Sequence, residues 1–348
     1  MPKNDLKKNL GIAGQLLAGI LIIVVILIML QNLLGYVQVQ STPPGWQIIR
    51  PPPEVSTLII ENDTVWTGGK GGVTIINRHT GMQVATPAPG PSFGYVRQIL
   101  RDRDGWIWIG HDGGLARFRN GSWQLIAPAT GIPFSKVLSL AQRSDGTMVI
   151  GTDTDVLSHR DGSWTSLLGP TSPPIACAEV LLEDRDANLW VGCGLPTHGG
   201  LYRLNGTSWS SFTLSDGLPH LSVRGIAQTR DGTVWVATGF ASRGGAALYS
   251  SGTWRNLTFA DGLAGECTRS VFEDDAGRLW IGSEYDGIAV GTPGSWKVLT
   301  EKDGLAGHEV KVMTQDSDGT YWLGTENGLS RIDKTAALTA DTGYHNGL

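Results

Sequence analysis

The sequence repeats one short pattern every forty-odd residues. The pattern is clear in the segment "RDRDGWIWIGHDGGLARFRNGSW", which begins at Arg101, and similar segments make seven copies along the chain. A hydrophobic marker position in these copies falls at Trp66, Trp108, Val149, Trp190, Trp235, Trp280 and Trp322. Its intervals are 42, 41, 41, 45, 45 and 42 residues, and a second tryptophan series keeps the same period at Trp123, Trp164, Trp209, Trp254 and Trp296. A fixed period of this length restricts the chain to a repeat architecture.

Each copy divides into four short strands separated by turns. In the second copy we expect strands at 96–102, at "WIWIG", at "GLARFR" and at "SWQLI", with an Asp-Gly turn in the first hairpin and an Asn-Gly turn in the last. These dipeptides favour tight hairpins because both central residues of a type I′ turn need positive φ. Four antiparallel strands repeated at this period are typical of propeller blades. The sequence therefore predicts an all-β fold, a seven-bladed β-propeller, with the regular tryptophans packed as core between blades.

The segment "GWQIIR" at residues 45–50 has the form of a fourth strand, although it precedes the first copy. It nearly matches "GSWQLI" at 121–126, whereas the seventh copy ends in "GLSRID" at 328–333 with no such strand after it. An incomplete blade would expose a sheet edge, which promotes aggregation. We therefore expect residues 45–50 to close the last blade, so that the propeller spans 45–334 and leaves a C-terminal tail at 335–348.

Residues 10–34 are almost entirely apolar, and twenty such residues in a helix would span roughly 30 Å, the thickness of a bilayer core. A cleaved signal peptide would usually be shorter and end in an Ala-x-Ala-like site, which "GYVQVQSTPP" does not offer. The sequence therefore predicts a transmembrane α-helix (signal anchor) at 10–34, between a tail at 1–9 and a linker at 35–44. Lys3, Lys7 and Lys8 favour a cytoplasmic N-terminus, so we expect a single-pass cell-membrane protein whose propeller is periplasmic or extracellular.

Several copies combine a Val/Ile-rich strand, Asp-x-Asp-Gly, Leu-Trp-Ile-Gly-Thr and Gly-Gly-Leu-x-Arg. The pattern occurs as "EDDAGRLWIGS" from 273, "QDSDGTYWLGT" from 315 and "GGLYRL" from 199. It resembles the two-component regulator propeller repeat over about residues 45–334. The resemblance implies a periplasmic sensing propeller like those of hybrid sensor histidine kinases, in which tandem propellers precede an immunoglobulin-like sandwich, a membrane helix and a kinase. This chain departs from that plan, because its one propeller follows the apolar segment and about fourteen residues come after the last copy, so no kinase domain is expected.

The position eleven residues before the marker is basic in most of the later copies. Four copies have a basic residue there and two do not: Arg97, Arg224, Arg269 and Lys311, against Leu138 and Glu179. This position would lie near the mouth of the central channel, where focused positive potential favours an anionic ligand such as an acidic glycan or a carboxylate. Alternatively, the side-chain stems cover apolar strand surface while their heads pair with nearby carboxylates.

Copies four and five have the longest predicted loops on the same face of the propeller. These loops are "GCGLPTHGG" at 192–200 and "ATGFASRGG" at 237–245. Function tends to collect on long loops held by a rigid scaffold. We therefore take His198 and Arg243 as candidate ligand contacts.

The remaining motifs indicate no chemistry. His111, His198, His220 and His308 are expected on one face, but they belong to four copies and share no short metal-ligand spacing, so no metal site is predicted. "GGKGG" at 68–72 lacks the Ser or Thr that follows Gly-Lys in a P-loop, and no Gly-x-Ser-x-Gly elbow occurs. We expect no catalytic residues and no cofactor.

The chain has three cysteines. Cys177 and Cys193 flank the first hairpin of copy four and would face each other if that hairpin folded about Arg185. A cross-strand disulfide would then be within reach in an oxidising compartment. Cys267 would be left over. Free thiols are the alternative to this disulfide.

The expected function is binding. A net charge of −5 argues against a dedicated nucleic-acid binder. We expect a membrane-anchored propeller that binds a ligand or partner protein, as an accessory sensor in two-component-like signalling. One alternative is a structural or interaction subunit of a membrane protein complex. The other is a propeller enzyme like the streptogramin lyases, which have a catalytic His and a divalent metal at the channel mouth.

Overall fold

The computed structural model describes residues 21–26, 42–84, 90–127 and 135–339. The chain divides into two compact units, 1–43 and 44–348, which are described separately. In the first unit, residues 21–26 are helical and exposed. Within the described ranges no helix is long and apolar enough to span a membrane. The predicted span at 10–34 falls mostly outside those ranges, as do the tail at 1–9 and most of the linker at 35–44, so the anchor stays a prediction.

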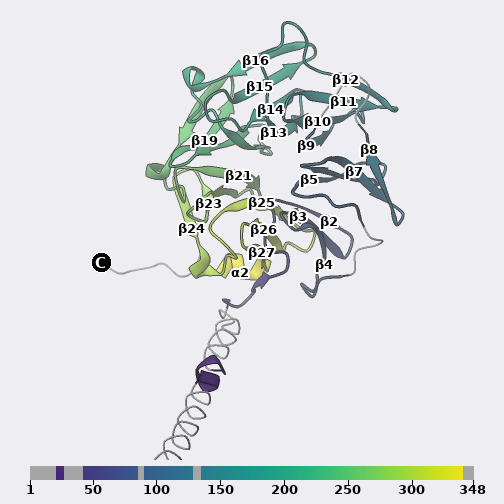
Figure 1. Ribbon diagram of the computed structural model, residues 1–348. Helices are drawn as coiled ribbons and strands as arrows, with labels where there is room; N and C mark the ends of the chain where they lie inside the picture. Colours follow the sequence, from purple (N-terminus) through teal and green to yellow (C-terminus); the bar gives the residue numbers. More distant parts are fainter. Residues whose placement is uncertain (1–20, 27–41, 85–89, 128–134, 340–348) are drawn as a thin grey trace, which may run out of the picture. The chain divides into compact units, whose positions relative to one another are not determined.

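The second unit is a ring of seven antiparallel sheets, shown in Figure 1. Blade 1 comprises β2 (Thr57–Glu61), β3 (Thr64–Gly69) and β4 (Gly72–Asn77). Blade 2 comprises β5 (Val96–Arg101), β6 (Ile107–His111), β7 (Gly114–Arg119) and β8 (Ser122–Ile126). Blade 3 comprises β9 (Val137–Gln142), β10 (Met148–Thr152), β11 (Val156–Arg160) and β12 (Ser163–Ser166). Blade 4 comprises β13 (Ala178–Glu183), β14 (Leu189–Cys193), β15 (Gly200–Asn205) and β16 (Ser208–Phe212).

The last three blades follow the same plan. Blade 5 comprises β17 (Val223–Gln228), β18 (Val234–Phe240), β19 (Arg243–Ser250) and β20 (Thr253–Leu257). Blade 6 comprises β21 (Thr268–Glu273), β22 (Leu279–Ser283), β23 (Ile288–Thr292) and β24 (Ser295–Leu299). Blade 7 comprises β25 (Val310–Gln315), β26 (Tyr321–Thr325), β27 (Gly328–Ile332) and β1 (Trp46–Ile49). Short 3-10 turns follow blades 4, 5 and 6, at η1 (Leu214–Asp216), η2 (Phe259–Asp261) and η3 (Glu301–Asp303), and helix α2 (Lys334–Thr339) follows blade 7. The all-β seven-bladed propeller predicted from the period is confirmed.

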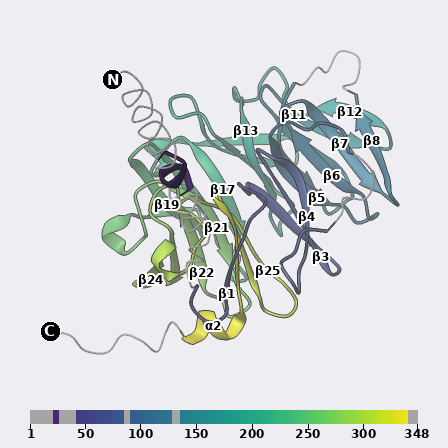
Figure 2. The ribbon, with the colours of Figure 1, turned by 60° about the horizontal axis from the view of Figure 1, so that its bottom comes forward.

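The ring closes through the N-terminal strand. β1 pairs antiparallel with β27, with Trp46 opposite Ile332 and Ile49 opposite Leu329. The amide of Asp333 also donates to the carbonyl of Gly45 over 2.8 Å, just before α2 begins. In Figure 2, β1 and α2 lie at the same end of blade 7. The predicted pairing of this segment with the last blade is therefore confirmed.

Blade 1 departs from the predicted four strands. Its sheet contains three strands among the described residues. Beyond β4, Gln83 forms an isolated bridge with Ile76, and Val84 donates to the Ile75 carbonyl over 2.9 Å. Residues 85–89, which follow, lie outside the described ranges. The pattern of the first copy is degenerate, which agrees with this irregular outer edge.

The marker tryptophans are core residues held by the aspartate of the repeat. Trp108, Trp190, Trp280 and Trp322 are each at most 2% exposed. Their indole Nε1 groups donate to Asp102, Asp184, Asp274 and Asp316 over 2.7, 2.7, 2.9 and 3.0 Å. In each case the other carboxylate oxygen accepts backbone amides of the turn that joins the first two strands. Burying one indole stabilises the fold by roughly 4 to 6 kcal/mol before entropy is subtracted. The first Asp of Asp-x-Asp-Gly is therefore structural, because it ties the turn to the tryptophan between blades.

Candidate functional site

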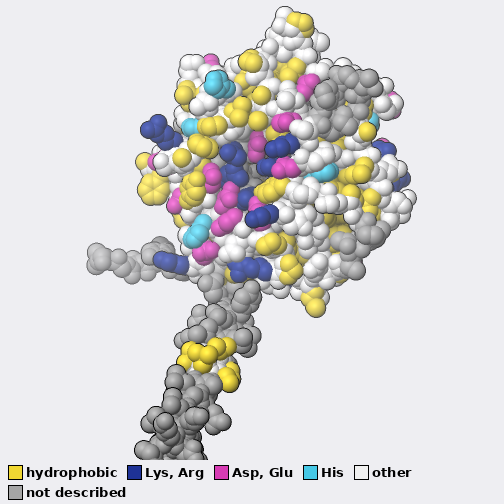
Figure 3. Space-filling view, viewed as in Figure 1, with side chains coloured by type: hydrophobic (Ala, Val, Ile, Leu, Met, Phe, Trp, Pro, Cys, Tyr) yellow, Lys and Arg dark blue, Asp and Glu magenta, His cyan; other side chains and the backbone are white. Residues whose placement is uncertain are grey.

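The innermost strands line an open cavity of about 220 Å³ on the channel axis. β2, β5, β9, β13, β17, β21 and β25 all contribute to its lining. It contains all six residues that sequence analysis placed at the channel mouth: Arg97, Leu138, Glu179, Arg224, Arg269 and Lys311. In Figure 3, basic and acidic side chains alternate at the centre of this face. The predicted clustering of these positions therefore occurs.

A β-bulge places each of these six side chains. In blades 2 to 7 the pairing of the first strand with the second shifts by one residue at this position. Examples are the shift between Val96 and Gln98 around Arg97, and the shift between Val310 and Val312 around Lys311. The other four bulges fall at Leu138, Glu179, Arg224 and Arg269. A bulged residue leaves the ladder and can re-aim its side chain, so the repeat presents one side chain per blade to the channel.

On blades 6, 7 and 1 the charged groups form one connected network. Arg269 Nε lies 2.7 Å from Glu309 Oε1, and Lys311 Nζ lies 3.2 Å from Glu309 Oε2. Lys311 Nζ also lies 2.7 Å from Glu54 Oε1, and the Tyr95 hydroxyl donates to the same oxygen. The charged side chains in this set are between 11 and 17% exposed. We call these five residues (Glu54, Tyr95, Arg269, Glu309 and Lys311) the mouth network.

Burial and pairing act in opposite directions on the charges of the mouth network. Burial raises the pKa of the Glu54 carboxyl, but hydrogen bonds from Lys311 and Tyr95 outweigh it and leave that pKa below its ordinary value. Burial lowers the pKa of the Lys311 ammonium, but Glu54 and Glu309 leave it above its ordinary value. Both groups therefore stay charged at neutral pH.

On blade 2, Arg97 is also committed to a carboxylate. Its Nε and Nη2 groups donate to the two carboxylate oxygens of Asp112 over 2.7 and 3.1 Å. Its guanidinium carbon lies 4.3 Å from the centre of the Tyr95 ring. The hydrogen bond from Arg97 holds the pKa of Asp112 below its ordinary value. Such bidentate pairs are stronger than single contacts.

Blades 4 and 5 contain a much looser pair. Arg224 Nη1 lies 3.6 Å from Glu179 Oε1, too far for a hydrogen bond. The Arg224 Nε donates to Ser222 Oγ over 3.2 Å, and the Glu179 carboxylate is hydrogen-bonded to no described residue. Among the described residues that line the cavity, Glu179 is the one carboxylate. We call Glu179 and Arg224 the open pair.

Two predicted contacts lie on the connections of blades 4 and 5. His198 is exposed on the loop between β14 and β15, and its Nδ1 lies 2.9 Å from the Thr197 hydroxyl. The predicted loop at 237–245 is wrong, because β18 and β19 extend through it and pair to Phe240 and Arg243 in a tight hairpin. Its alternating small residues allow this extension, and Ala241 at the tip has φ of 56°. Arg243 is exposed at the start of β19.

His220 lies near the open pair. Burial, followed by the charges of Arg224 and Arg243, holds the pKa of its imidazole below its ordinary value. The Nδ1 of His220 accepts the Ser222 amide over 2.9 Å. This tautomer and the lowered pKa keep the ring neutral at pH 7.

Sequence reasoning missed the partners of the cations. It did not single out Glu54, Tyr95, Asp112 or Glu309. One signal was available for Glu309, because it precedes Lys311 by two residues and alternate strand residues share a face. Glu54 lies outside the repeats and Asp112 lies in a loop, so neither had a periodic signal.

The other histidines do not converge. His111 is 4% exposed, with Nδ1 2.9 Å from the Phe93 carbonyl oxygen, and its pKa is lowered by burial. His308 pairs instead with Glu301 over 3.0 Å. In the part of the chain that the structure describes, no three His, Cys, Asp or Glu side chains are grouped as metal ligands.

The predicted Cys177–Cys193 disulfide is absent, since both residues and Cys267 are free thiols. The hairpin is centred one residue beyond Arg185, with Glu183 opposite Leu189, so Cys193 lies opposite Ala178 and not opposite Cys177. Cys177 instead accepts the Gly194 amide through its carbonyl, with φ of 55°. Burial raises the pKa of Cys193 to about 12, and burial with a hydrogen bond to Glu284 raises the pKa of Cys267 to about 12. Neither thiol is a nucleophile at neutral pH.

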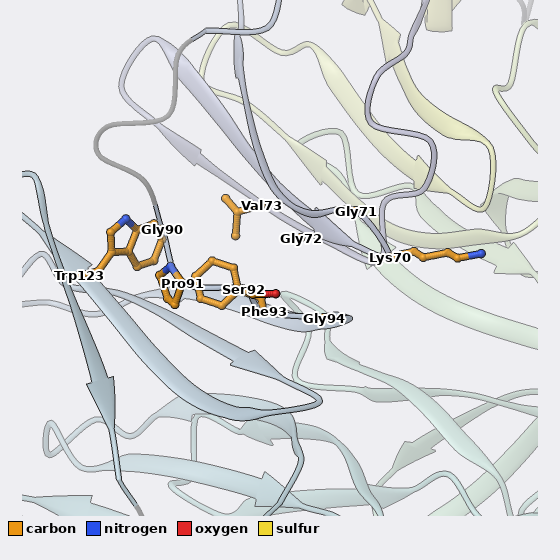
Figure 4. Close-up of a pocket in the computed structure, with 10 residues that line it drawn as sticks. All are labelled: Lys70, Gly71, Gly72, Val73, Gly90, Pro91, Ser92, Phe93, Gly94 and Trp123. Atoms are coloured by element: carbon orange, nitrogen blue, oxygen red, sulfur yellow. The ribbon is translucent and has the colours of Figure 1, made fainter.

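A second cavity of about 400 Å³ lies between blades 1 and 2. Figure 4 shows the Phe93 and Trp123 rings on one side of it and the Lys70 side chain extending away from them. The polar groups of its lining therefore do not converge as those of the channel cavity do.

Comparison with known proteins agrees with this fold. Four segments match the family model described as two component regulator propeller: residues 90–113, 217–240, 262–285 and 304–327. No curated protein matches the chain.

Solved structures share the architecture at low identity. The extracellular domain of the putative hybrid two component system BT3049 from B. thetaiotaomicron is similar with a TM-score of 0.72 and 19% identity, over 86% of this chain and 42% of that one. This chain thus spans less than half of that structure. Virginiamycin B lyase from Staphylococcus aureus is similar with a TM-score of 0.64 and 13% identity, over 83% of this chain and 98% of that one. YCF48 bound to D1 peptide is similar with a TM-score of 0.64 and 13% identity, over 84% of this chain and 97% of that one. The chain is a seven-bladed β-propeller, and four of its segments match the two component regulator propeller model.

Proposed function

We propose that this chain is an extracytoplasmic binding propeller that holds a ligand at the channel mouth and acts as an accessory sensor in two-component-like signalling. The observation that carries the proposal is the cavity into which bulges direct four basic side chains, one from each of blades 2, 5, 6 and 7. The match to two-component regulator repeats and the fold shared with an extracellular sensor domain support it. Ligand sites in propellers use this kind of axial position because a ring of strands converges there.

The proposal includes the predicted anchor. A transmembrane helix at 10–34 with a cytoplasmic N-terminus would hold the propeller outside the cytoplasm. The test is protease protection of the full chain in sealed membranes, with an epitope tag at each terminus. We expect external protease to remove the C-terminal tag and spare the N-terminal one. The reverse pattern, or release of the chain from membranes by carbonate, would contradict the proposal.

Ligand binding is tested on the full chain in detergent by thermal shift. A panel of acidic glycans, neutral glycans and small polar metabolites is screened against the wild type and against Arg224→Met and Arg269→Met. We expect at least one compound to stabilise the wild type and to lose its effect in a variant. Arg160→Met is the matched control, because Arg160 forms exposed ion pairs on the outer part of blade 3. Stabilisation that survives both channel substitutions would contradict a site at the mouth.

Exposed aromatic side chains favour a second candidate, an interaction subunit of a membrane complex. Phe240 is 47% exposed at the tip of the β18–β19 hairpin, and Tyr285, between β22 and β23, is 53% exposed. Exposed aromatics are enriched at protein interfaces, and YCF48, which shares the fold, was solved with a bound peptide. A stoichiometric partner that copurifies with the wild type and is lost in Phe240→Ser would favour this role. The lyase alternative has the shared fold alone in its favour.

A further inference from the structure

The channel cavity is asymmetric in its charge pairing. Glu309 and Glu54 contact their cations at 2.7 Å, and Asp112 holds Arg97 in a bidentate pair. None of these three carboxylates lines the cavity, whereas Glu179 does. Glu179 is also the carboxylate whose nearest cation lies beyond hydrogen-bond distance, at 3.6 Å. The open pair thus offers one acceptor and one donor side by side, both with unused bonding capacity.

A ligand with one sign of charge would fit this arrangement poorly. An anion inserted at Arg224 would meet the Glu179 carboxylate in the same confined space, and like charges at such distances repel. A cation inserted at Glu179 would meet the Arg224 guanidinium, whose charge has no close carboxylate partner among the described residues. A zwitterion satisfies both members of the open pair, since its carboxylate can accept from the guanidinium while its ammonium donates to Glu179.

The size and walls of the cavity restrict the ligand further. About 220 Å³ is smaller than the usual site for a drug-sized ligand, which is about 300 to 1,000 Å³. Beside the charged side chains the lining includes the aliphatic residues Val180, Ile226, Val271 and Val312, together with the polar residues Ser56, Gln98 and Ser270. This volume suits a small molecule whose short apolar side chain can lie against the aliphatic residues of the lining.

We propose that the open pair binds a small zwitterion with an apolar side chain, of the free α-amino acid class. The α-carboxylate bonds Arg224, the α-ammonium bonds Glu179, and the side chain lies against the aliphatic residues of the inner strands. This inference rests on the proposed function, because it assigns the ligand class of the same channel site. It replaces the expected acidic glycan with a ligand of no net charge.

Three matched probes test the proposal on the full chain by calorimetric titration. L-leucine is zwitterionic, 4-methylpentanoate lacks its ammonium, and 3-methylbutylamine lacks its carboxylate. We expect leucine to bind and each analogue to bind at least about tenfold more weakly, because each leaves one buried charge unpaired. Glu179→Gln should weaken leucine binding by about tenfold or more. Asp161→Asn is the control, because Asp161 lies 3.7 Å from Arg160 outside the channel and should leave leucine binding unchanged.

The outcomes separate this inference from the proposed function. Equal binding of leucine and 4-methylpentanoate, or leucine binding that persists in Glu179→Gln, would overturn the zwitterion site. A different result would overturn the zwitterion site and leave the proposed function standing. In that result none of the three probes binds, and a glycan stabilises the wild type but not Arg224→Met. If no probe binds and no compound of the thermal-shift panel stabilises the wild type, the result would count against both the zwitterion site and the proposed function. An unchanged melting temperature of unliganded Glu179→Gln shows that any loss of binding is not loss of fold.

Discussion

The two halves of the channel mouth use similar residues in different ways. In the mouth network on blades 6, 7 and 1, two cations and two carboxylates are linked by ion pairs of 2.7 to 3.2 Å. The open pair on blades 4 and 5 leaves 3.6 Å between a guanidinium and a carboxylate of comparable burial. Removing one partner of a buried, fully paired charge destabilises a structure, whereas a charge with unused bonding capacity can accept a further partner. The comparison shows that the charges of one half are closely paired, whereas the open pair leaves bonding capacity unused.

The largest effect is expected from Lys311→Met. The substitution keeps the side-chain stem but leaves Glu54 and Glu309 without their shared cation. We expect the free energy of unfolding to fall by about 3 kcal/mol, in the range for breaking a buried pair. Urea denaturation followed by tryptophan fluorescence measures it. Lys70→Met, at an exposed lysine, should cost less than about 0.5 kcal/mol, and a similar cost for the two variants would remove the distinction between the halves.

A smaller effect, which depends on pH, is expected from Glu54→Gln. The amide keeps the shape but not the charge, so we expect a loss of about 1 to 2 kcal/mol at pH 7. The pKa of Glu54 is lowered in the folded state, so its charge contributes stability above the ordinary value of 4.5, and that contribution is lost as pH falls through the folded pKa. The difference between wild type and variant should therefore shrink below about pH 4.5. A difference that stays constant from pH 7 to pH 3 would be inconsistent with this ion pair.

The smallest effect on stability is expected at the open pair. Glu179→Gln and Arg224→Met should each lower the free energy of unfolding by less than about 1 kcal/mol, because the pair is long and partly exposed. A double-mutant cycle should give a coupling below about 0.5 kcal/mol. The cycle of Arg269→Met with Glu309→Gln should give a coupling several times larger. Equal couplings in the two cycles would mean that both halves are structural.

The repeat made most of the fold predictable. Regular spacing of Trp108, Trp190 and Trp280 specified the blades because each indole needs the same burial site. The likeness of residues 45–50 to a fourth strand specified the closure. The extension of β18 to Phe240 was not predictable, since glycine and small residues suit loops and hairpins alike.

The site was predictable in position but not in pairing. Arg97 and Arg224 recur at one repeat position, so the channel location followed from the period. Whether a cation at the mouth is paired with a carboxylate depends on non-periodic residues such as Glu54. Glu54 follows β1 and reaches the mouth only after the ring has closed. The missing disulfide has a separate cause, because the hairpin of β13 and β14 is centred one residue beyond Arg185 and Cys193 therefore lies opposite Ala178.

The pairing of β1 with β27 has a consequence for biosynthesis. Trp46 and its partner Ile332 are separated by about 290 residues, so at roughly 5 to 20 residues per second the ribosome needs about 15 to 60 s to deliver the second after the first. For that interval the earliest strand has no permanent neighbour and its hydrogen-bonding groups are open to other chains or to proteases. Newly made chains that stall before residue 328 would never complete the circle, which makes the final stretch of translation the step that commits this protein to its native state.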